Sequence, residues 1–226
     1  MSTLAETLAL LQFGDSFFPS GAVSFSWGLE GLSDSGAIRG ADDARAFVIG
    51  QLGARWAEFD RAVVVAAHRA RMNLDDVAAI DDQVEIQTPC TEFRSGSRRM
   101  GEALLSVFAR LGIGDAGAYR DKVKRAEAYA HLPAMQGYLW GRAGLGEADA
   151  VALSAHSFAT GLLGAGIRLG CLSHIDAQKI LIEARAEAAR LAARPVPPIE
   201  ALSAYGVEAE IAVMQHANNN LRVFAN

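Results

Sequence analysis

Histidine and cysteine are the side chains of this sequence that could bind a soft or borderline metal ion. Five histidines and two cysteines are present, and Cys171 and His174 are spaced so that both could reach one ion. A closed site needs four ligands, and no second pair lies nearby in the sequence. The alternative is a buried cysteine beside a surface histidine. We favour this alternative and expect no metal site and no cofactor.

Catalysis by a histidine and a carboxylate from distant parts of the chain is a second option. His131 or His156 could pair with Glu30 or Glu92 in a helical enzyme with a dispersed site. The usual catalytic motifs are missing, because the sequence has no GxxxxGK[ST] loop and no GxSxG, HExxH or CxxC segment. A hydrogen-bonded core histidine is the default interpretation of His156. We therefore expect no catalytic residue, and the helical enzyme remains the alternative.

Three glycines imitate a dinucleotide-binding fingerprint. They are Gly164, Gly166 and Gly170 in the segment GAGIRLG. That fingerprint works only where a strand turns into a helix, because the helix N-terminus then holds the pyrophosphate. The preceding residues, ALSAHSFATGLL, have helical character themselves. We therefore place these glycines inside a helix, where they allow close packing.

Charged residues gather in two places. Arg94, Arg98 and Arg99 lie close together, and the first two share a helical face. They form either a surface with local ion pairs or a docking patch for an acidic partner. The acidic pairs at 75–76 and 81–82 are typical of a solvated helical face.

The elements that position these residues are predicted to be helices throughout. The sequence has 43 alanines against 25 valines and isoleucines together, which favours helix over strand. Apolar residues also recur at helical spacing in most segments. We predict an all-α fold, a single globular bundle of about ten helices with a C-terminal tail. The expected helical segments are 4–13, 26–34, a long region from 42 that bends near 59–60, 74–87, 91–111, 119–129, a segment up to 145, 147–172, 175–193 and 199–216.

Composition narrows the class of protein. The net charge is −5 and the pI is near 5.5, without the basic stripe that neutralises nucleic-acid phosphates. Two cysteines suit a reducing cytosol, and the N-terminus does not resemble a signal peptide. The apolar stretch 151–172 is rich in Ala, Gly and Ser, which favours a buried core helix over a membrane span. We predict a cytoplasmic protein that binds neither nucleic acid nor membrane.

An aromatic segment near the N-terminus is unusual for a solvated loop. Phe17, Phe18, Phe25 and Trp27 lie among serines, glycines and a proline. Their apolar surface predicts a contact with another chain, and a two-fold dimer is the commonest way to cover it. The alternative is that these rings fold back into the core.

The same segment resembles the N-terminal motif of the urease accessory protein UreF family, roughly PxGGFSYSQGLE. Phe25 and Trp27 stand where that family usually has Tyr and Gln or His. Four further segments follow in the family's order, so the resemblance covers nearly the whole chain. The five segments are PSGAVSFSWGLE at 19–30, EFRSGSRRMGEALL at 92–105, HLPAMQG at 131–137, AGIRLG at 165–170 and MQH at 214–216 with Arg222 and Phe224.

The resemblance implies a non-enzymatic, all-α protein that is usually a homodimer. Such a protein joins UreD (also called UreH) and the GTPase UreG in a GTP-dependent chaperone complex that inserts nickel into apo-urease. The partner-binding residues that it implies are Ser24, Phe25, Ser26, Gly28, Glu30, Arg94, His216, Arg222 and Phe224.

Three prolines at 195, 197 and 198 form a stiff linker. We therefore divide the chain into an all-α domain at 1–194 and a linker with a partner-binding tail at 195–226. Arg222 and Phe224 combine a planar charged group with a ring, as interface anchors do. The competing account is a frayed terminus without a role.

Overall fold

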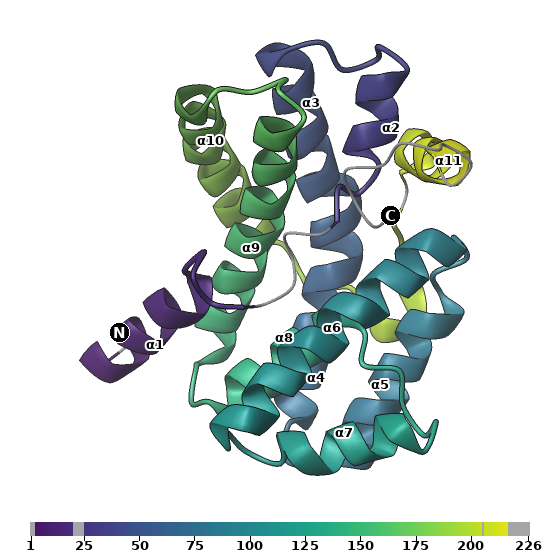
Figure 1. The fold of residues 1–226 in the computed structure, drawn as a ribbon. Helices are drawn as coiled ribbons and strands as arrows, with labels where there is room; N and C mark the ends of the chain where they lie inside the picture. Colours follow the sequence, from purple (N-terminus) through teal and green to yellow (C-terminus); the bar gives the residue numbers. More distant parts are fainter. Residues whose placement is uncertain (1–2, 20–24, 205, 217–226) are drawn as a thin grey trace.

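The computed structural model describes residues 3–19, 25–204 and 206–216, which form helices and contain no β-strand (Figure 1). The prediction of an all-α bundle with about ten helices is confirmed. In chain order the elements are α1 (Leu4–Gly14), α2 (Leu29–Asp34), α3 (Ala41–Gln51), the π-helix η2 (Leu52–Asp60), α4 (Arg61–Ala70), α5 (Leu74–Ile86), α6 (Thr91–Leu111), α7 (Ala116–Lys124), α8 (Leu132–Arg142), α9 (Glu147–Arg168), α10 (His174–Ala192), the 3-10 turn η3 (Ile199–Ala201) and α11 (Val207–His216).

Helix boundaries follow the local stop signals where these are strong. α6 has the predicted bounds, because Gly112 adopts a left-handed conformation with φ 69° and ends the helix. α2 begins at Leu29 rather than at residue 26, because Trp27 (φ 54°) and Gly28 (φ 89°) are left-handed. α7 begins three residues before its predicted start and ends at Lys124, five residues before its predicted end, since Ala126 has a positive φ of 57°.

Around the predicted bend at residues 59–60 the structure has a local change in helix type, and the bend itself stays a prediction. α3, η2 and α4 form one continuous helical rod, and η2 is π-helical from Leu52 to Asp60. A π-helix has i→i+5 hydrogen bonds, so it widens the helix and changes which side chains share a face. Most residues of this rod beyond Leu52 are buried, whereas Arg69 near its end is exposed.

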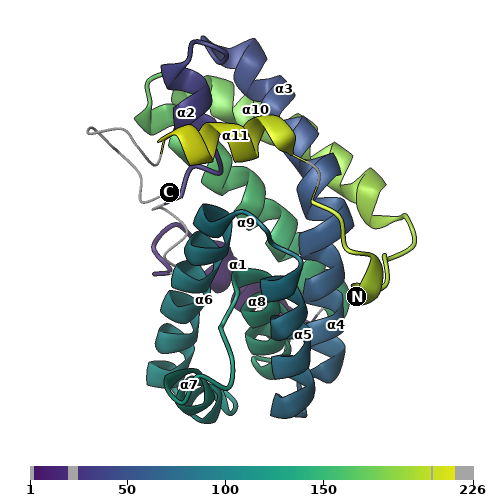
Figure 2. The ribbon, with the colours of Figure 1, turned by 90° about the vertical axis from the view of Figure 1, so that its right-hand side faces the viewer.

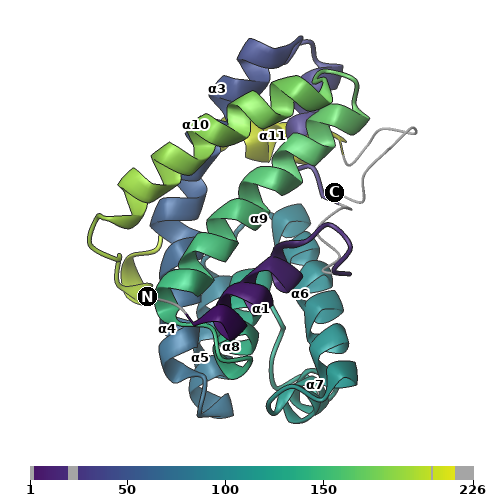
Figure 3. The same cartoon turned by 90° about the vertical axis from the view of Figure 1, so that its left-hand side faces the viewer.

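Two hydrophobic clusters build the core, and α9 contributes to both. One cluster joins α9 to α3, η2 and α10, and the other joins it to α4 and α8. The helix runs between the two ends of the protein, as Figure 3 shows. Among the described residues α9 is the one helix long and apolar enough to span a membrane, and 56% of its most apolar window is buried. Its packing against α4, α8 and α10 confirms the predicted core helix.

The chain on both sides of the prolines lies against the body. The Arg61 guanidinium donates to the carbonyl oxygens of Leu191 and Arg194, both at 3.0 Å, and of Pro195 at 2.9 Å. The Gln87 side-chain amide donates to the Ile199 carbonyl at 2.9 Å. α11 then crosses α2 at the upper end of the protein (Figure 2). The division into two domains at residue 194 stays a prediction.

Candidate functional site

The described part of the N-terminal motif lies inside the protein. Phe25, Ser26 and Glu30 are buried, and the Ser26 hydroxyl accepts a hydrogen bond from the Glu30 backbone amide at 3.5 Å. This bond satisfies a free donor in the first turn of α2. These residues therefore stabilise the start of α2 from inside the protein. A partner would contact the exposed side chains around them.

Three of the four N-terminal aromatic rings are buried, so the predicted aromatic contact surface is wrong for them. Phe18, Phe25 and Trp27 belong to the core, whereas Phe17 is 93% exposed. The rings of Phe25 and Trp27 pack edge to face with centroids 5.1 Å apart. Phe25 also lies so close to Gly96 of α6 that a Cβ atom there would overlap its ring. For these three residues the alternative prediction, that the rings fold back into the core, is correct.

The backbones of α2 and α11 are in direct contact at two glycines. A Cβ atom on Gly28 would lie 2.7 Å from the Ala209 carbonyl oxygen, and one on Gly31 would lie 2.6 Å from that of Ala212. Gly28 also needs its positive φ to begin α2. Two family-like segments far apart in the sequence, one at 19–30 and one at 214–216, thus belong to neighbouring helices.

The positively charged side chain of Arg55 is buried against Trp27, the residue that precedes Gly28. The Arg55 guanidinium is 4.3 Å from the centre of the Trp27 ring, and its Nε is 3.4 Å from Oδ2 of Asp60. Burial raises the pKa of Asp60, and the Arg55 charge opposes that shift. Sequence reasoning missed both residues. Their spacing of five residues becomes informative only in a π-helix, which turns them toward one another.

Arg94 belongs to a polar cluster between α5, α6 and the start of α8. Glu85 accepts from Nε of Arg98 at 2.8 Å, and Nε of Arg94 lies 3.3 Å from it. The His131 Nε2 atom is 2.9 Å from the same carboxylate. Burial raises the pKa of Glu85, but the hydrogen bonds from Arg98 and His131 outweigh this effect and hold the pKa below its usual value. Of the two accounts of this arginine patch, the structure supports local ion pairs for Arg94 and Arg98.

A second carboxylate of α5 fixes the turn before α8. Asp81 accepts hydrogen bonds from the Tyr119 hydroxyl at 3.0 Å and from the backbone amides of residues 129, 130 and 131 at 2.7–2.8 Å. The positive φ of Ala130 turns these consecutive N–H groups toward one acceptor. The predicted solvated acidic face is therefore wrong for Asp81, which is fully buried, and right for the exposed Asp82.

The histidines of the alternative catalytic site occupy different environments. His131 is fully buried and contacts Glu85, not the Glu30 or Glu92 that we considered, and burial lowers its pKa. His156 is exposed on α9, so the predicted core histidine is wrong. It faces outward because the buried face of this part of α9 is formed by Leu153, Ser154 and Ala155.

The remaining candidate residues fall into three groups. Cys171 is half-buried and its thiol donates to the Gly166 carbonyl at 3.2 Å, while His174 is exposed at the start of α10. Gly164 and Gly166 lie within α9, as predicted, and Gly170 follows its end. His216 is the last residue of α11, and Ser24, Arg222 and Phe224 lie outside the described residues. No group of three or more metal-binding side chains occurs among the residues that the structure describes.

The fold and the site together define an all-helical protein. Several of its candidate residues, such as Phe25, Gly28 and Arg94, make contacts between helices. The sequence profile of the UreF family matches residues 38–185. The chain is 32% identical to the urease accessory protein UreF of Trichodesmium erythraeum, with 100% of this chain and 99% of that protein covered. It is 32% identical to UreF 1 of Brucella melitensis (99% and 94% covered) and 26% identical to UreF of Yersinia enterocolitica (98% and 99% covered). The chain therefore belongs to the UreF family of urease accessory proteins.

Proposed function

We propose that this chain joins UreD (UreH) and the GTPase UreG in a GTP-dependent chaperone complex that inserts nickel into apo-urease in the cytoplasm. It contributes binding surface and no catalytic group, and it acts as a homodimer. The observation that carries the proposal is the docking of α11 on the N-terminal motif, because it joins two segments that characterise the family. Nickel is the cargo of the complex in this proposal.

The outer face of α11 is the surface that we assign to a partner. Ile211 and Met214 are both 46% exposed there, although their helix is held to α2 by close backbone contacts. Apolar side chains on a firmly held helix can bind a partner at a low entropic cost. The sequence continues from α11 into Arg222 and Phe224, which extend the same assignment into the tail.

Two variants test this surface. Removal of residues 217–226, or Ile211→Glu, should leave the melting temperature nearly unchanged and abolish co-purification with the UreD and UreG homologues. Both variants should also lose urease activation in cells. Ile86→Glu is the matched control, because Ile86 is 64% exposed on α5 and should tolerate the change. A truncated chain that still assembles the complex and activates urease fully would show that the tail has no role.

A reconstitution tests the role itself. Apo-urease, nickel, UreD, UreG and this chain are combined with GTP or a non-hydrolysable analogue, and the nickel content of the urease is measured. We expect nickel transfer only with GTP and only when this chain is present. The chain alone should not hydrolyse GTP or urea. Turnover of either by the purified chain would favour the helical enzyme, and nickel transfer without the chain would contradict the proposal.

A further inference from the structure

Arg61, the first residue of α4, is a buried cation that donates hydrogen bonds to five backbone carbonyl oxygens. Its side chain is almost completely enclosed, with 1% of the residue exposed. Its Nε atom donates to the Ala57 carbonyl of the preceding π-helix at 3.1 Å. The other four acceptors lie where α10 passes into the linker: Leu191 at 3.0 Å, Ala192 at 3.2 Å, Arg194 at 3.0 Å and Pro195 at 2.9 Å. Arginine suits this task, because its planar guanidinium carries five N–H donors.

These bonds join the end of α10 to a distant part of the chain. The last carbonyl groups of a helix lack partners within the helix and carry partial negative charge, so a cation is favourable there. For α10 the cation comes from another helix, 130 positions before Leu191 in the sequence. The end of α10 is therefore attached to the buried rod that contains α4.

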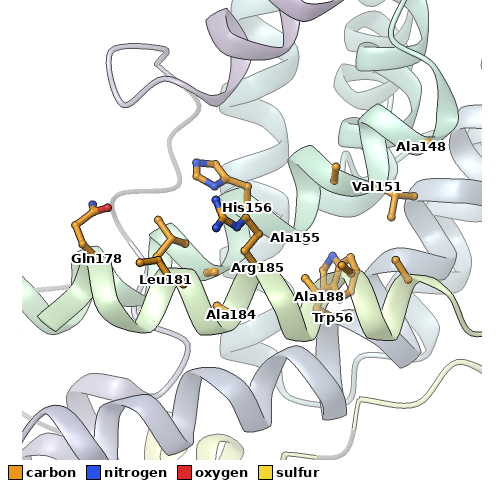
Figure 4. Close-up of a pocket in the computed structure, with 15 residues that line it drawn as sticks. Trp56, Ala148, Val151, Ala155, His156, Gln178, Leu181, Ala184, Arg185 and Ala188 are labelled. Carbon is orange, nitrogen blue, oxygen red and sulfur yellow. The ribbon is translucent and has the colours of Figure 1, made fainter. Parts of the chain in front are cut away.

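Side-chain packing does little to hold this end of α10. After Ala184, Leu191 is the one buried residue of the helix. On the side toward α9 the last turns line a groove of about 360 Å³, and Ala188 and Ala192 form part of its wall (Figure 4). A groove offers few of the van der Waals contacts that hold a closely packed helix. The hydrogen bonds of Arg61, together with the burial of Leu191, therefore fix the end of α10.

The proline linker transmits this orientation along the chain. Pro195 is itself an acceptor of Arg61, and two further prolines follow at 197 and 198. Proline fixes its own φ and restricts the residue before it to extended conformations, so the segment is stiff. The chain turns back after α10, and α11 then lies across α2 (Figure 2). The direction that the chain takes at Pro195 thus bears on where α11 can lie.

The path from the prolines to α11 has weaker anchors than Arg61. The Gln87 amide donates to the Ile199 carbonyl at 2.9 Å, and the Ser203 backbone amide donates to the Glu58 carbonyl at 3.4 Å. Ile199 and its neighbours pack on the core and remain partly exposed. These contacts guide the chain, whereas the buried five-bond anchor lies at its start.

The contact that α11 must reach tolerates little displacement. A Cβ atom on Gly31 would lie 2.6 Å from the Ala212 carbonyl oxygen, so the two backbones meet without room for a shifted register. A helix that arrives in the wrong place would lose this contact and move Ile211 and Met214, the exposed apolar residues of α11. The position of α11 therefore depends on the segment that delivers it.

We propose that Arg61 is a positioning residue for the partner-binding surface. It fixes the end of α10 and the direction of the linker, and thereby sets where α11 lies on α2. Arg61 touches no partner, because it is buried, and it acts through the linker alone. The inference rests on the proposed function for the identity of the partners. The position of α11 itself is a property of the isolated chain.

Hydrogen exchange of the purified full chain gives the first test. Arg61→Lys keeps the positive charge and lacks the planar group that reaches several carbonyls. Phe108→Leu is the matched control, because it weakens the core where the Phe108 ring packs against Phe13 and Phe18. The backbone amides of residues 207–216 should exchange about tenfold faster in Arg61→Lys than in the control. The amides of α8 should exchange at similar rates in both variants.

A linker variant tests the same route without touching the core. Pro195→Gly combined with Pro198→Gly changes two exposed residues, so the melting temperature should stay nearly unchanged. Exchange at residues 207–216 should again become about tenfold faster, because the segment loses its stiffness. Adding Arg61→Lys to this variant should cause little further change, since both act through one segment. The linker variant also decides the question if Arg61→Lys does not fold.

Co-purification with the UreD and UreG homologues connects the position of α11 with assembly. Arg61→Lys and the linker variant should both lose the complex, and Phe108→Leu should keep it. Unchanged exchange at residues 207–216 in the linker variant, or independent effects of the two changes, would overturn the proposal. So would a normal complex formed by variants whose α11 exchanges faster. A wild-type chain that binds neither homologue would instead refute the proposed function, and the exchange rates would still show whether Arg61 positions α11.

Discussion

Replacing Asp81 with alanine should destabilise the protein strongly, although the residue lies on α5 and not on the surface of α11 that we assign to a partner. Its carboxylate is the acceptor for the Tyr119 hydroxyl and for three consecutive backbone amides at residues 129–131. Alanine removes this acceptor and leaves four donors without a partner, of which three are buried and the Tyr129 amide is partly buried. The turn that begins α8 and positions His131 then loses its anchor.

The size of the effect follows from those four donors. A buried donor without a partner costs about 1–3 kcal/mol. Taking the lower value for each, because water can enter part of the space that the carboxylate leaves, gives about 4 kcal/mol. Domains are typically stable by about 5–15 kcal/mol, so this is a large share of the total. Asp81→Asn keeps one carbonyl acceptor and should lose about half as much.

Urea unfolding followed by circular dichroism measures the loss. With a slope of about 2 kcal/mol per molar urea, Asp81→Ala should lower the midpoint by about 2 M. Asp82→Ala is the matched control, since Asp82 is exposed, and should change stability by less than about 0.5 kcal/mol. If the midpoints of Asp81→Ala and Asp82→Ala agree within about 0.5 M, the buried acceptor does not stabilise the turn as argued.

Two further predictions concern packing and pH. Gly166→Leu should cost about 1–3 kcal/mol in a thermal melt, because a Cβ atom there would lie 2.7 Å from Cδ1 of Leu172, and it should release no bound nucleotide. The pKa of Glu85 is held below its usual value, so the stability that it contributes is present above its unfolded-state pKa and is lost as the pH falls through the folded-state pKa. Glu85→Gln should therefore flatten the acidic limb of stability against pH, whereas Glu102→Gln, at an exposed carboxylate, should not.

Helices could be predicted well from the sequence because their signals are local. The bounds of α6 follow from a glycine stop and a regular apolar repeat, and both lie within the helix itself or next to it. The start of α2 was misplaced because Trp27 adopts a left-handed conformation that aromatic residues seldom take. Packing of its ring against Phe25 and Arg55 favours that conformation, and such packing is not visible in a local pattern.

The candidate site was harder to predict because burial depends on distant elements. Asp81 and Asp82 are chemically identical neighbours, yet a turn nearly fifty residues later buries one and leaves the other in water. The same holds for Phe25, which is buried because Gly96 of α6 leaves space for its ring. Motif resemblance indicated candidate residues, but only the fold distinguishes those that are buried beneath a surface from those that form it.

The contact between α2 and α11 also has a consequence during synthesis. Gly28 and Gly31 leave the ribosome well before Ala209 and Ala212, which cover them and are made roughly 180 residues later. At about 5–20 residues per second, the roughly 180 intervening residues take on the order of 10–40 s to translate. Throughout that interval the glycine face of α2 lacks its cover. A nascent or prematurely terminated chain therefore exposes a backbone surface that the finished protein hides, which makes it a natural site for chaperone or protease recognition.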